Sequence, residues 1–293
     1  MATQLHSDAE RGTWLSLIDS NRIRCRALPF AKETMRVTNG LRIVGLGVAL
    51  VALASLVGNA LLGNALYRSV AKLNQLRVFP LGAETNNYAI TTSADTRRSI
   101  AMWGDSRAYL WDAALLATRL HCLNFAHGAQ TSSQLLLQLE TAPAFHTDVA
   151  LVQIGINDLH PLGALQTEKG RILAQLQRNL RSIRDQLSAR ADIVVLTTIM
   201  PPDHVPLQRR LFWDGQTLQY ITEFNRQLES LVDNKKIFLL DANALLRDND
   251  GFLDAHYVDH DFFLHVNAAA YQVLNAHLLR IVTTAHPLSA EIK

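Results

Sequence analysis

Ser106 is the residue of this sequence whose position best suits nucleophilic chemistry. It ends the segment 101–106, AMWGDS, where an apolar run gives way to a helix-like stretch. A serine hydroxyl is a weak nucleophile until a base takes its proton, and the oxyanion formed by attack on a carbonyl needs hydrogen-bond donors. Alternatively, Ser106 or Asp105 only caps the helix that follows. A nucleophilic role therefore requires a base, an orienting acid and donors elsewhere in the chain.

The rest of the sequence supplies polar clusters in suitable places. Apolar runs alternate with longer helical stretches, which indicates a mostly parallel sheet covered on both faces by helices. The expected strands are 99–103, 122–126, 149–154, 193–198 and 237–240. The expected helices are 108–119, 132–139, 167–188, 215–233 and 268–285.

Ligands of such open sheets bind outside the carboxyl ends of the strands. The polar clusters follow strand ends or lie in the last loop, and they are 104–106, 127–129, 155–158 and 261–267. All four clusters are therefore expected on one edge of the sheet.

In this order, the clusters resemble the motif blocks of the SGNH superfamily of GDSL-type esterases and lipases, over residues 98–285. Gly-Asp-Ser at 104–106 resembles the first block, Gly128 the second, Gly-Ile-Asn-Asp at 155–158 the third and His265 the fifth. The resemblance implies a flavodoxin-like, three-layer α/β/α sandwich with a five-stranded parallel sheet. It also implies hydrolysis or transfer of acyl groups.

The resemblance assigns a role to each matching residue. Ser106 is expected to attack and His265 to carry its proton, since an unperturbed imidazole pKa of about 6.5 allows both steps near neutrality. The oxyanion hole is expected to consist of the backbone N–H groups of Ser106 and Gly128 and the side-chain amide of Asn157. In the alternative interpretation, Gly128 supplies a positive φ in a turn, and Asn157 and Asp158 form a turn after a strand.

The base and the acid require a choice among several residues. Six histidines lie near expected loops: His127, His160, His204, His256, His260 and His265. His265 is preferred because His265-Val266-Asn267 matches the family's His-x-Asn arrangement, and His260 is the reserve. The family's acid usually stands three residues before the histidine, where this chain has Phe262. Asp261 is therefore the chosen acid and Asp259 the next, while a backbone carbonyl could also orient the imidazole.

An uncharged run of 25 residues, 43–67, is long enough to cross about 30 Å of hydrocarbon. It predicts one transmembrane helix between an N-terminal segment, 1–42, and a linker, 68–95, with the catalytic domain at 96–293. Basic residues are in excess before the span, which places the N-terminus in the cytoplasm and the domain on the periplasmic side of the inner membrane. A cleaved signal peptide is the main alternative, but a polar leader of this length is unusual.

Composition and spacing argue against several other classes. A net charge of +2 without a dense basic block in the domain gives little support for nucleic-acid binding. No metal-ligand spacing or glycine-rich phosphate loop is found, so neither a metal nor a cofactor is expected. Cys25 and Cys122 would lie on opposite sides of the membrane, so no internal disulfide is expected.

Together these features predict a membrane-anchored serine hydrolase that cleaves an ester through an acyl-enzyme. Its substrate would be an ester-bearing small molecule, a lipid or an O-acylated glycan. One alternative is an O-acetyltransferase acting on an envelope or exported polysaccharide, and another is a non-catalytic binding or assembly protein. The loop 201–213 could flank a substrate cleft or could be an ordinary packed loop.

Overall fold

The computed structural model describes residues 30–78 and 97–285 of the chain. Within this part, five parallel strands form one sheet in the order β2-β1-β3-β4-β5. The strands are β1 (Ser99–Gly104), β2 (His121–Asn124), β3 (Thr147–Gln153), β4 (Ala191–Thr197) and β5 (Ile237–Leu240). Because all five run in the same direction, their carboxyl ends meet at one edge of the sheet. The expected flavodoxin-like α/β architecture is confirmed.

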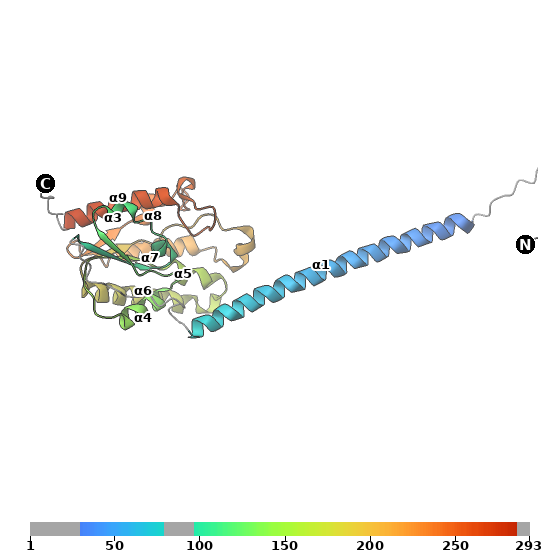
Figure 1. Ribbon diagram of the computed structural model, residues 1–293, viewed down its shortest axis with the longest axis horizontal. Helices are drawn as coiled ribbons and strands as arrows, with labels where there is room; N and C mark the ends of the chain where they lie inside the picture. The colour runs from blue at the N-terminus through green and yellow to red at the C-terminus, as the bar shows by residue number, and fades with distance from the viewer. Residues whose placement is uncertain (1–29, 79–96, 286–293) are drawn as a thin grey trace, which may run out of the picture. The chain divides into compact units, whose positions relative to one another are not determined.

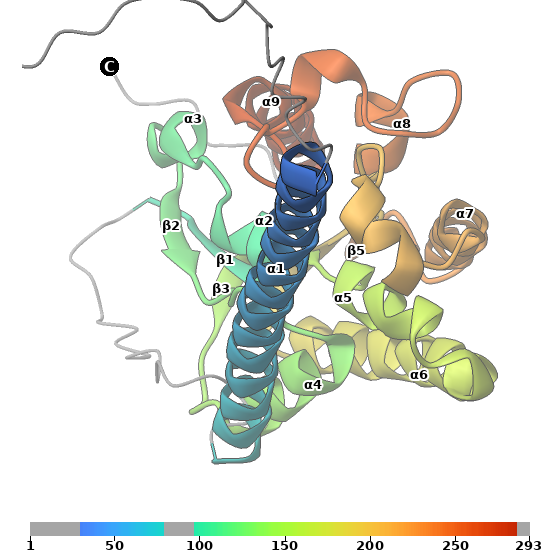
Figure 2. The same cartoon turned by 90° about the vertical axis from the view of Figure 1, so that its right-hand side faces the viewer.

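Helices cover both faces of the sheet, as Figures 1 and 2 show for the domain. One face packs against α4 (Ser132–Thr141), α6 (Lys169–Ser188) and α7 (Thr217–Glu229). The other packs against α3 (Ala114–Ala117), α8 (Ala242–Leu246) and α9 (Ala268–Ala285). Side chains of β3 alternate between the two cores, Ala150 and Val152 facing the first, Val149 and Leu151 the second. This alternation makes the central strands apolar throughout.

The prediction of one helix over 108–119 is wrong. The structure has two short helices there, α2 (Ser106–Tyr109) and α3, separated by a turn. Trp111 lies buried in this turn and donates from Nε1 to Asn275 Oδ1 at 2.7 Å. Asn275 in turn donates to the carbonyl of Asp112 at 2.6 Å, and the Asp112 carboxylate accepts from the Ala114 N–H. Contacts to α9, distant in sequence, therefore interrupt the helical pattern.

Short elements that the periodicity did not reveal lie mostly in the loops after the strands. They are α5 (Ile156–Leu159), η1 (His160–Gly163), η2 (Gln166–Glu168), η3 (Leu207–Phe212), α8 and η4 (Ala255–Tyr257), where η denotes a 3₁₀ helix. The first four follow β3 or β4, whereas α8 and η4 follow β5. They therefore shape the edge of the sheet at which the polar clusters were expected.

The N-terminal helix α1 (Phe30–Val78) contains a stretch, Arg42–Asn74, that is long and apolar enough to cross a membrane. Its described side chains are almost all exposed, unlike those of a core helix of a soluble protein. The helix extends beyond the expected span, 43–67, and includes residues 68–78 of the expected linker. Residues 79–96 and Cys25 lie outside the described residues.

Candidate active site

Ser106 is the first residue of α2, and Asp105 alone separates it from Gly104, the last residue of β1. Figure 2 shows α2 next to β1. Gly104 makes this turn possible: its φ is +141°, and a Cβ there would stand 1.7 Å from the carbonyl oxygen of Gln153 in β3. Only glycine tolerates both conditions. Asp105 is the N-cap of α2 and accepts from the Arg107 N–H, so the capping role considered for Ser106 falls to its neighbour.

His265 meets Ser106 across the edge of the sheet. Its Nε2 atom lies 3.2 Å from Ser106 Oγ, within hydrogen-bond distance, although 159 positions separate the two residues. An antiparallel bridge between Val258 and Val266 holds the loop that carries His265, and Asn267 donates to the carbonyls of His256 and Val258. The asparagine of the His-x-Asn sequence thus braces this loop.

The reserve histidine and the chosen acid are placed differently. His260 is exposed and, within residues 97–285, forms no hydrogen bond with Ser106. The Asp261 side chain is also exposed, and no hydrogen bond joins it to His265 among the described residues. Asp259 is half-buried, accepts from the Asp261 N–H at 3.0 Å, and raises the pKa of His265 through its charge. The structure therefore brings Asp259 into the electrostatic environment of the imidazole.

The three groups expected to form the oxyanion hole keep free donor capacity in the described part of the chain. The backbone N–H groups of Ser106 and Gly128 meet no acceptor in the described part of the chain. The His127 N–H donates to the Gly104 carbonyl at 2.9 Å, which fastens the Gly128 loop to the end of β1. Asn157 donates one amide hydrogen to the Gln130 carbonyl at 3.1 Å, leaving the other free. These bonds tie the second and third motif blocks to the serine turn.

The alternative role of Gly128, a positive φ in a turn, is not what the structure shows. Gly128 has no positive φ, and the left-handed residue of this turn is Ala129, with a φ of +59°. Gly155 has a φ of +124°, and a Cβ there would lie 2.7 Å from the side chain of Ile199. Gly155 thus serves close packing beneath the site, while Gly128 is exposed.

Asp158, the last residue of the third block, has a structural partner. Its carboxylate accepts from the Ser132 hydroxyl at 2.6 Å and from the Ser132 N–H at 2.9 Å, at the start of α4. Burial raises its pKa to about 6, against the lowering effect of these hydrogen bonds. Asp158 therefore positions the loop after β3 and has no contact with His265.

Arg107 is a residue of the site that the sequence did not reveal. Its side chain is fully buried, and its guanidinium donates to the carbonyls of Leu264 at 2.5 Å, Met200 at 2.6 Å and Pro201 at 3.2 Å. Leu264 directly precedes His265, so the arginine next to the serine holds the backbone next to the histidine. The one available signal was an arginine placed directly after the serine within an otherwise apolar helix start.

Burial and charge shift the pKa values around this cluster. Burial lowers the pKa of His265, and the positive charge of Arg107 lowers it further. Burial also raises the pKa of Asp105 to about 7, while Arg107 opposes the shift. An imidazole with a lowered pKa is neutral near pH 7, the state in which it can accept a proton from serine.

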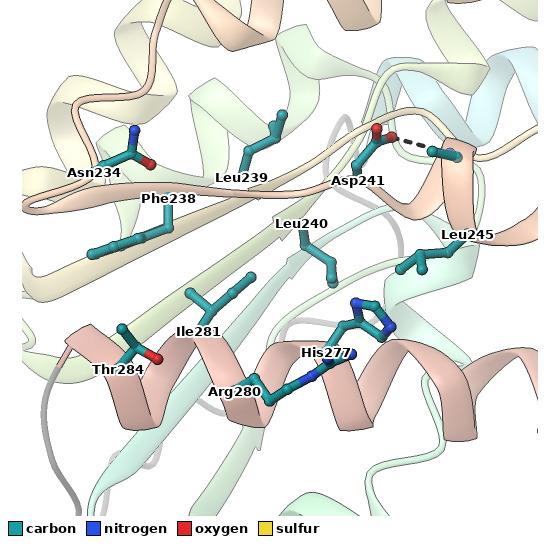
Figure 3. A pocket seen from close by; sticks show the side chains of 11 residues that line it. Asn234, Phe238, Leu239, Leu240, Asp241, Leu245, His277, Arg280, Ile281 and Thr284 are labelled. Carbon is teal, nitrogen blue, oxygen red and sulfur yellow. Dashed lines mark hydrogen bonds between the residues drawn. The ribbon is translucent and has the colours of Figure 1, made fainter.

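A cavity of about 640 Å³ lies elsewhere, between the edge strand β5 and α9 (Figure 3). Apolar side chains such as Phe238, Leu240 and Ile281 line it, with His277 and Arg280 on the helix side. None of the residues predicted for the site lines this cavity. Among the described residues, no group of histidine, cysteine and acidic side chains is arranged to hold a metal ion.

A parallel α/β sandwich with a hydrogen-bonded serine and histidine at the carboxyl edge is the architecture of SGNH hydrolases. The model of the GDSL-like lipase/acylhydrolase family matches residues 90–273, and the chain belongs to this family. The sequence matches none of the curated proteins with which it was compared.

Solved structures share the fold at low sequence identity. A protein from Streptococcus pneumonia described as a candidate platelet activating factor has 19% identity and a TM-score of 0.53, covering 65% of this chain and 86% of that one. A GDSL-like lipase from Bacteroides thetaiotaomicron has 18% identity and a TM-score of 0.51, with coverages of 64% and 89%. A candidate acylhydrolase from Bacteroides fragilis has 18% identity and a TM-score of 0.50, with coverages of 64% and 88%.

Proposed function

We propose that this chain is a serine hydrolase that cleaves a carboxylic ester through an acyl-enzyme on Ser106. The observation that carries the proposal is the 3.2 Å approach of His265 Nε2 to Ser106 Oγ at the carboxyl edge of the sheet. Membership of the GDSL-like family supports acyl chemistry in general. The lowered pKa of His265 supports its use as a base.

In the first half-reaction, His265 Nε2 takes the Ser106 hydroxyl proton as Oγ attacks the ester carbonyl carbon. The carbonyl oxygen becomes negatively charged, and the Ser106 N–H, the Gly128 N–H and the Asn157 amide stabilise it. The tetrahedral intermediate then collapses, the carbon–oxygen bond to the alcohol breaks, and His265 returns the proton to the leaving alcohol. Ser106 is left acylated.

In the second half-reaction, a water molecule attacks the acyl carbonyl while His265 accepts one of its protons. Collapse releases the carboxylic acid, and the same proton restores the Ser106 hydroxyl. Asp259 stabilises the transient imidazolium through its charge, which supports it as the acid of the site in preference to the exposed Asp261. A sugar hydroxyl in place of water would make the same chemistry an O-acyl transfer.

The candidate span Arg42–Asn74 supports attachment to a membrane. The excess of basic residues before the span supports the inner membrane with the N-terminus in the cytoplasm and the catalytic domain on the periplasmic side. In that location the domain meets ester-bearing small molecules, lipids and O-acylated glycans.

The test is hydrolysis of a short-chain chromogenic ester by the full chain in detergent. We expect Ser106→Ala to abolish turnover and labelling by a serine-directed phosphonate, while Ser230→Ala, an exposed serine after α7, changes neither. Unchanged turnover by a folded Ser106→Ala variant contradicts the proposal. Product analysis with an acyl donor and a glycan separates transfer from hydrolysis.

A further inference from the structure

The 3₁₀ helix η3 presents the most exposed large apolar side chains of residues 97–285. Leu207 is 78% exposed, Leu211 81% and Phe212 60%, whereas no other large hydrophobic residue of this range exceeds 54%. A cluster of exposed large apolar side chains on a globular domain marks a contact surface more often than a scattered single residue does. The segment is therefore a candidate contact surface.

Aromatic contacts connect this segment with the Ser106–His265 edge. The Arg209 guanidinium lies 4.9 Å from the Phe262 ring, and that ring lies 4.9 Å from the imidazole of His265. On the other side of η3, Trp213 packs edge-on against Phe263 at 5.3 Å. The exposed leucines are thus built onto the same part of the surface as the histidine.

The backbone of η3 packs closely against the rest of the domain. A Cβ at Gly163 of η1 would stand 2.2 Å from the Phe212 carbonyl oxygen, so the two 3₁₀ helices are in close contact. Leu165, which follows η1, is a further exposed apolar residue beside them. The leucines therefore project from a fixed base.

The charge of the segment indicates what it contacts. Residues 204–213 contain two arginines and no acidic residue. In the structure as described, neither Arg209 nor Arg210 forms an ion pair, and both are exposed. A second copy docked by a symmetric contact would bring these arginines toward their own equivalents, which is unfavourable. Apolar side chains beside unpaired arginines instead match the interface of a bilayer with anionic headgroups.

The chain also keeps a bilayer within reach of this surface. Eighteen residues, 79–96, separate α1 from the described part of the domain, and an extended chain of that length reaches about 60 Å. The candidate span and the domain belong to one chain, so a bilayer crossed by the span is kept near the domain at high effective concentration.

We propose that Leu207–Phe212 is a membrane-contact segment that inserts its apolar side chains into an anionic lipid interface and turns the Ser106–His265 edge toward the lipid. The proposal depends on the candidate span for the proximity of the bilayer, and it does not depend on catalysis.

The test places an environment-sensitive fluorophore on a single cysteine of the full chain in nanodiscs, with Cys25→Ser and Cys122→Ser as background. The labelled variants are Leu211→Cys, Glu229→Cys at the far end of α7 as the matched exposed control, and Ala54→Cys inside the candidate span. The discs contain phosphatidylcholine alone or equal parts phosphatidylcholine and phosphatidylglycerol. Spin-labelled lipid serves as the quencher.

We expect quenching at position 54 in all discs, quenching at 211 that is stronger with phosphatidylglycerol, and none at 229. Leu207→Asn should lower the equilibrium constant for contact at 211 about tenfold, because one leucine no longer inserts. Replacing Arg209 and Arg210 by glutamine should remove the preference for anionic lipid. The proposal is overturned if the fluorophores at 211 and 229 report equal exposure to water, or if the fluorophore at 54 is not quenched. It is also overturned if the fluorescence change at 211 depends on protein concentration and not on lipid. Since no readout uses turnover, these outcomes are independent of Ser106 chemistry.

Discussion

Replacing Arg107 by methionine tests whether the arginine positions His265 for catalysis. The substitution keeps most of the side-chain length but removes all donors to the carbonyls of Met200, Pro201 and Leu264. Each buried carbonyl left without a donor costs about 1–3 kcal/mol. Burial lowers the pKa of Arg107 to about 10 from an ordinary 12.5 despite the opposing charge of Asp105, a net penalty of about 3 kcal/mol on the charged form that a neutral side chain does not carry. The free energy of unfolding should therefore fall by about 3 kcal/mol.

The catalytic effect should exceed what this loss of stability explains. Without the bond to Leu264, the backbone beside His265 can shift, and a displacement of about 1 Å at a reacting group costs about 100-fold in rate. Because the charge of Arg107 lowers the pKa of His265, its removal should also raise that pKa. His265 must be neutral to act as a base, so the acid limb of the kcat/KM profile should move to higher pH.

The assay combines urea unfolding of the full chain in detergent with kcat/KM for a chromogenic ester across pH. Arg107→Lys is the matched control, since it keeps the charge but loses the planar fork of donors. Arg107→Lys should lower kcat/KM and leave the pH of its acid limb unchanged. A folded Arg107→Met variant with the original kcat/KM and the original pH profile refutes the reasoning and leaves Arg107 a purely structural role.

Three further predictions concern neighbouring residues. Asp259→Asn should lower kcat/KM and move its acid limb to lower pH, because the Asp259 charge raises the pKa of His265 and its loss lowers that pKa. Asp261→Asn should change neither, and the opposite result would identify Asp261 as the acid. Asn157→Ala should reduce kcat about 100- to 1,000-fold with little change in KM, and a purely KM effect would contradict an oxyanion role. Asp158→Ala should destabilise the chain in urea by about 2–4 kcal/mol through loss of two hydrogen bonds. Burial raises the pKa of Asp158 from 3.8 to about 6, so the contribution of Asp158 to the free energy of unfolding is complete below about pH 4 and falls as pH rises through 6. Asp158→Ala should therefore lower the free energy of unfolding more in acid than at about pH 8.

Structural features that depend on residues close together in the sequence were predictable. The apolar runs located all five strands, and β5 has the expected boundaries because the charged residues Lys236 and Asp241 flank it. Since parallel strands end at the same edge, placing Ser106 at that edge required only the position of the strand before it. His265 was placed there because the last loop resembles the family's His-x-Asn arrangement. The same reasoning failed at Trp111, where a buried hydrogen bond to Asn275 breaks the helix.

Only the tertiary structure decided how the polar groups pair. Arg107 bonds to a carbonyl 157 positions away, and no local pattern indicates that a charged residue will be fully buried there. The sequence favoured Asp261 over Asp259 as the acid near His265. In the structure Asp261 is exposed, whereas Asp259 shares the electrostatic environment of the imidazole, because the path of a loop depends on what packs against it. The exposure of Leu207 and Leu211 is likewise a property of the folded surface. Sequence periodicity thus determined the scaffold, and the resemblance of the motif blocks to a known family indicated Ser106 and His265 as the candidate reactive pair. Long-range packing determined which groups hold these two residues in place and which side chains form the surface around them.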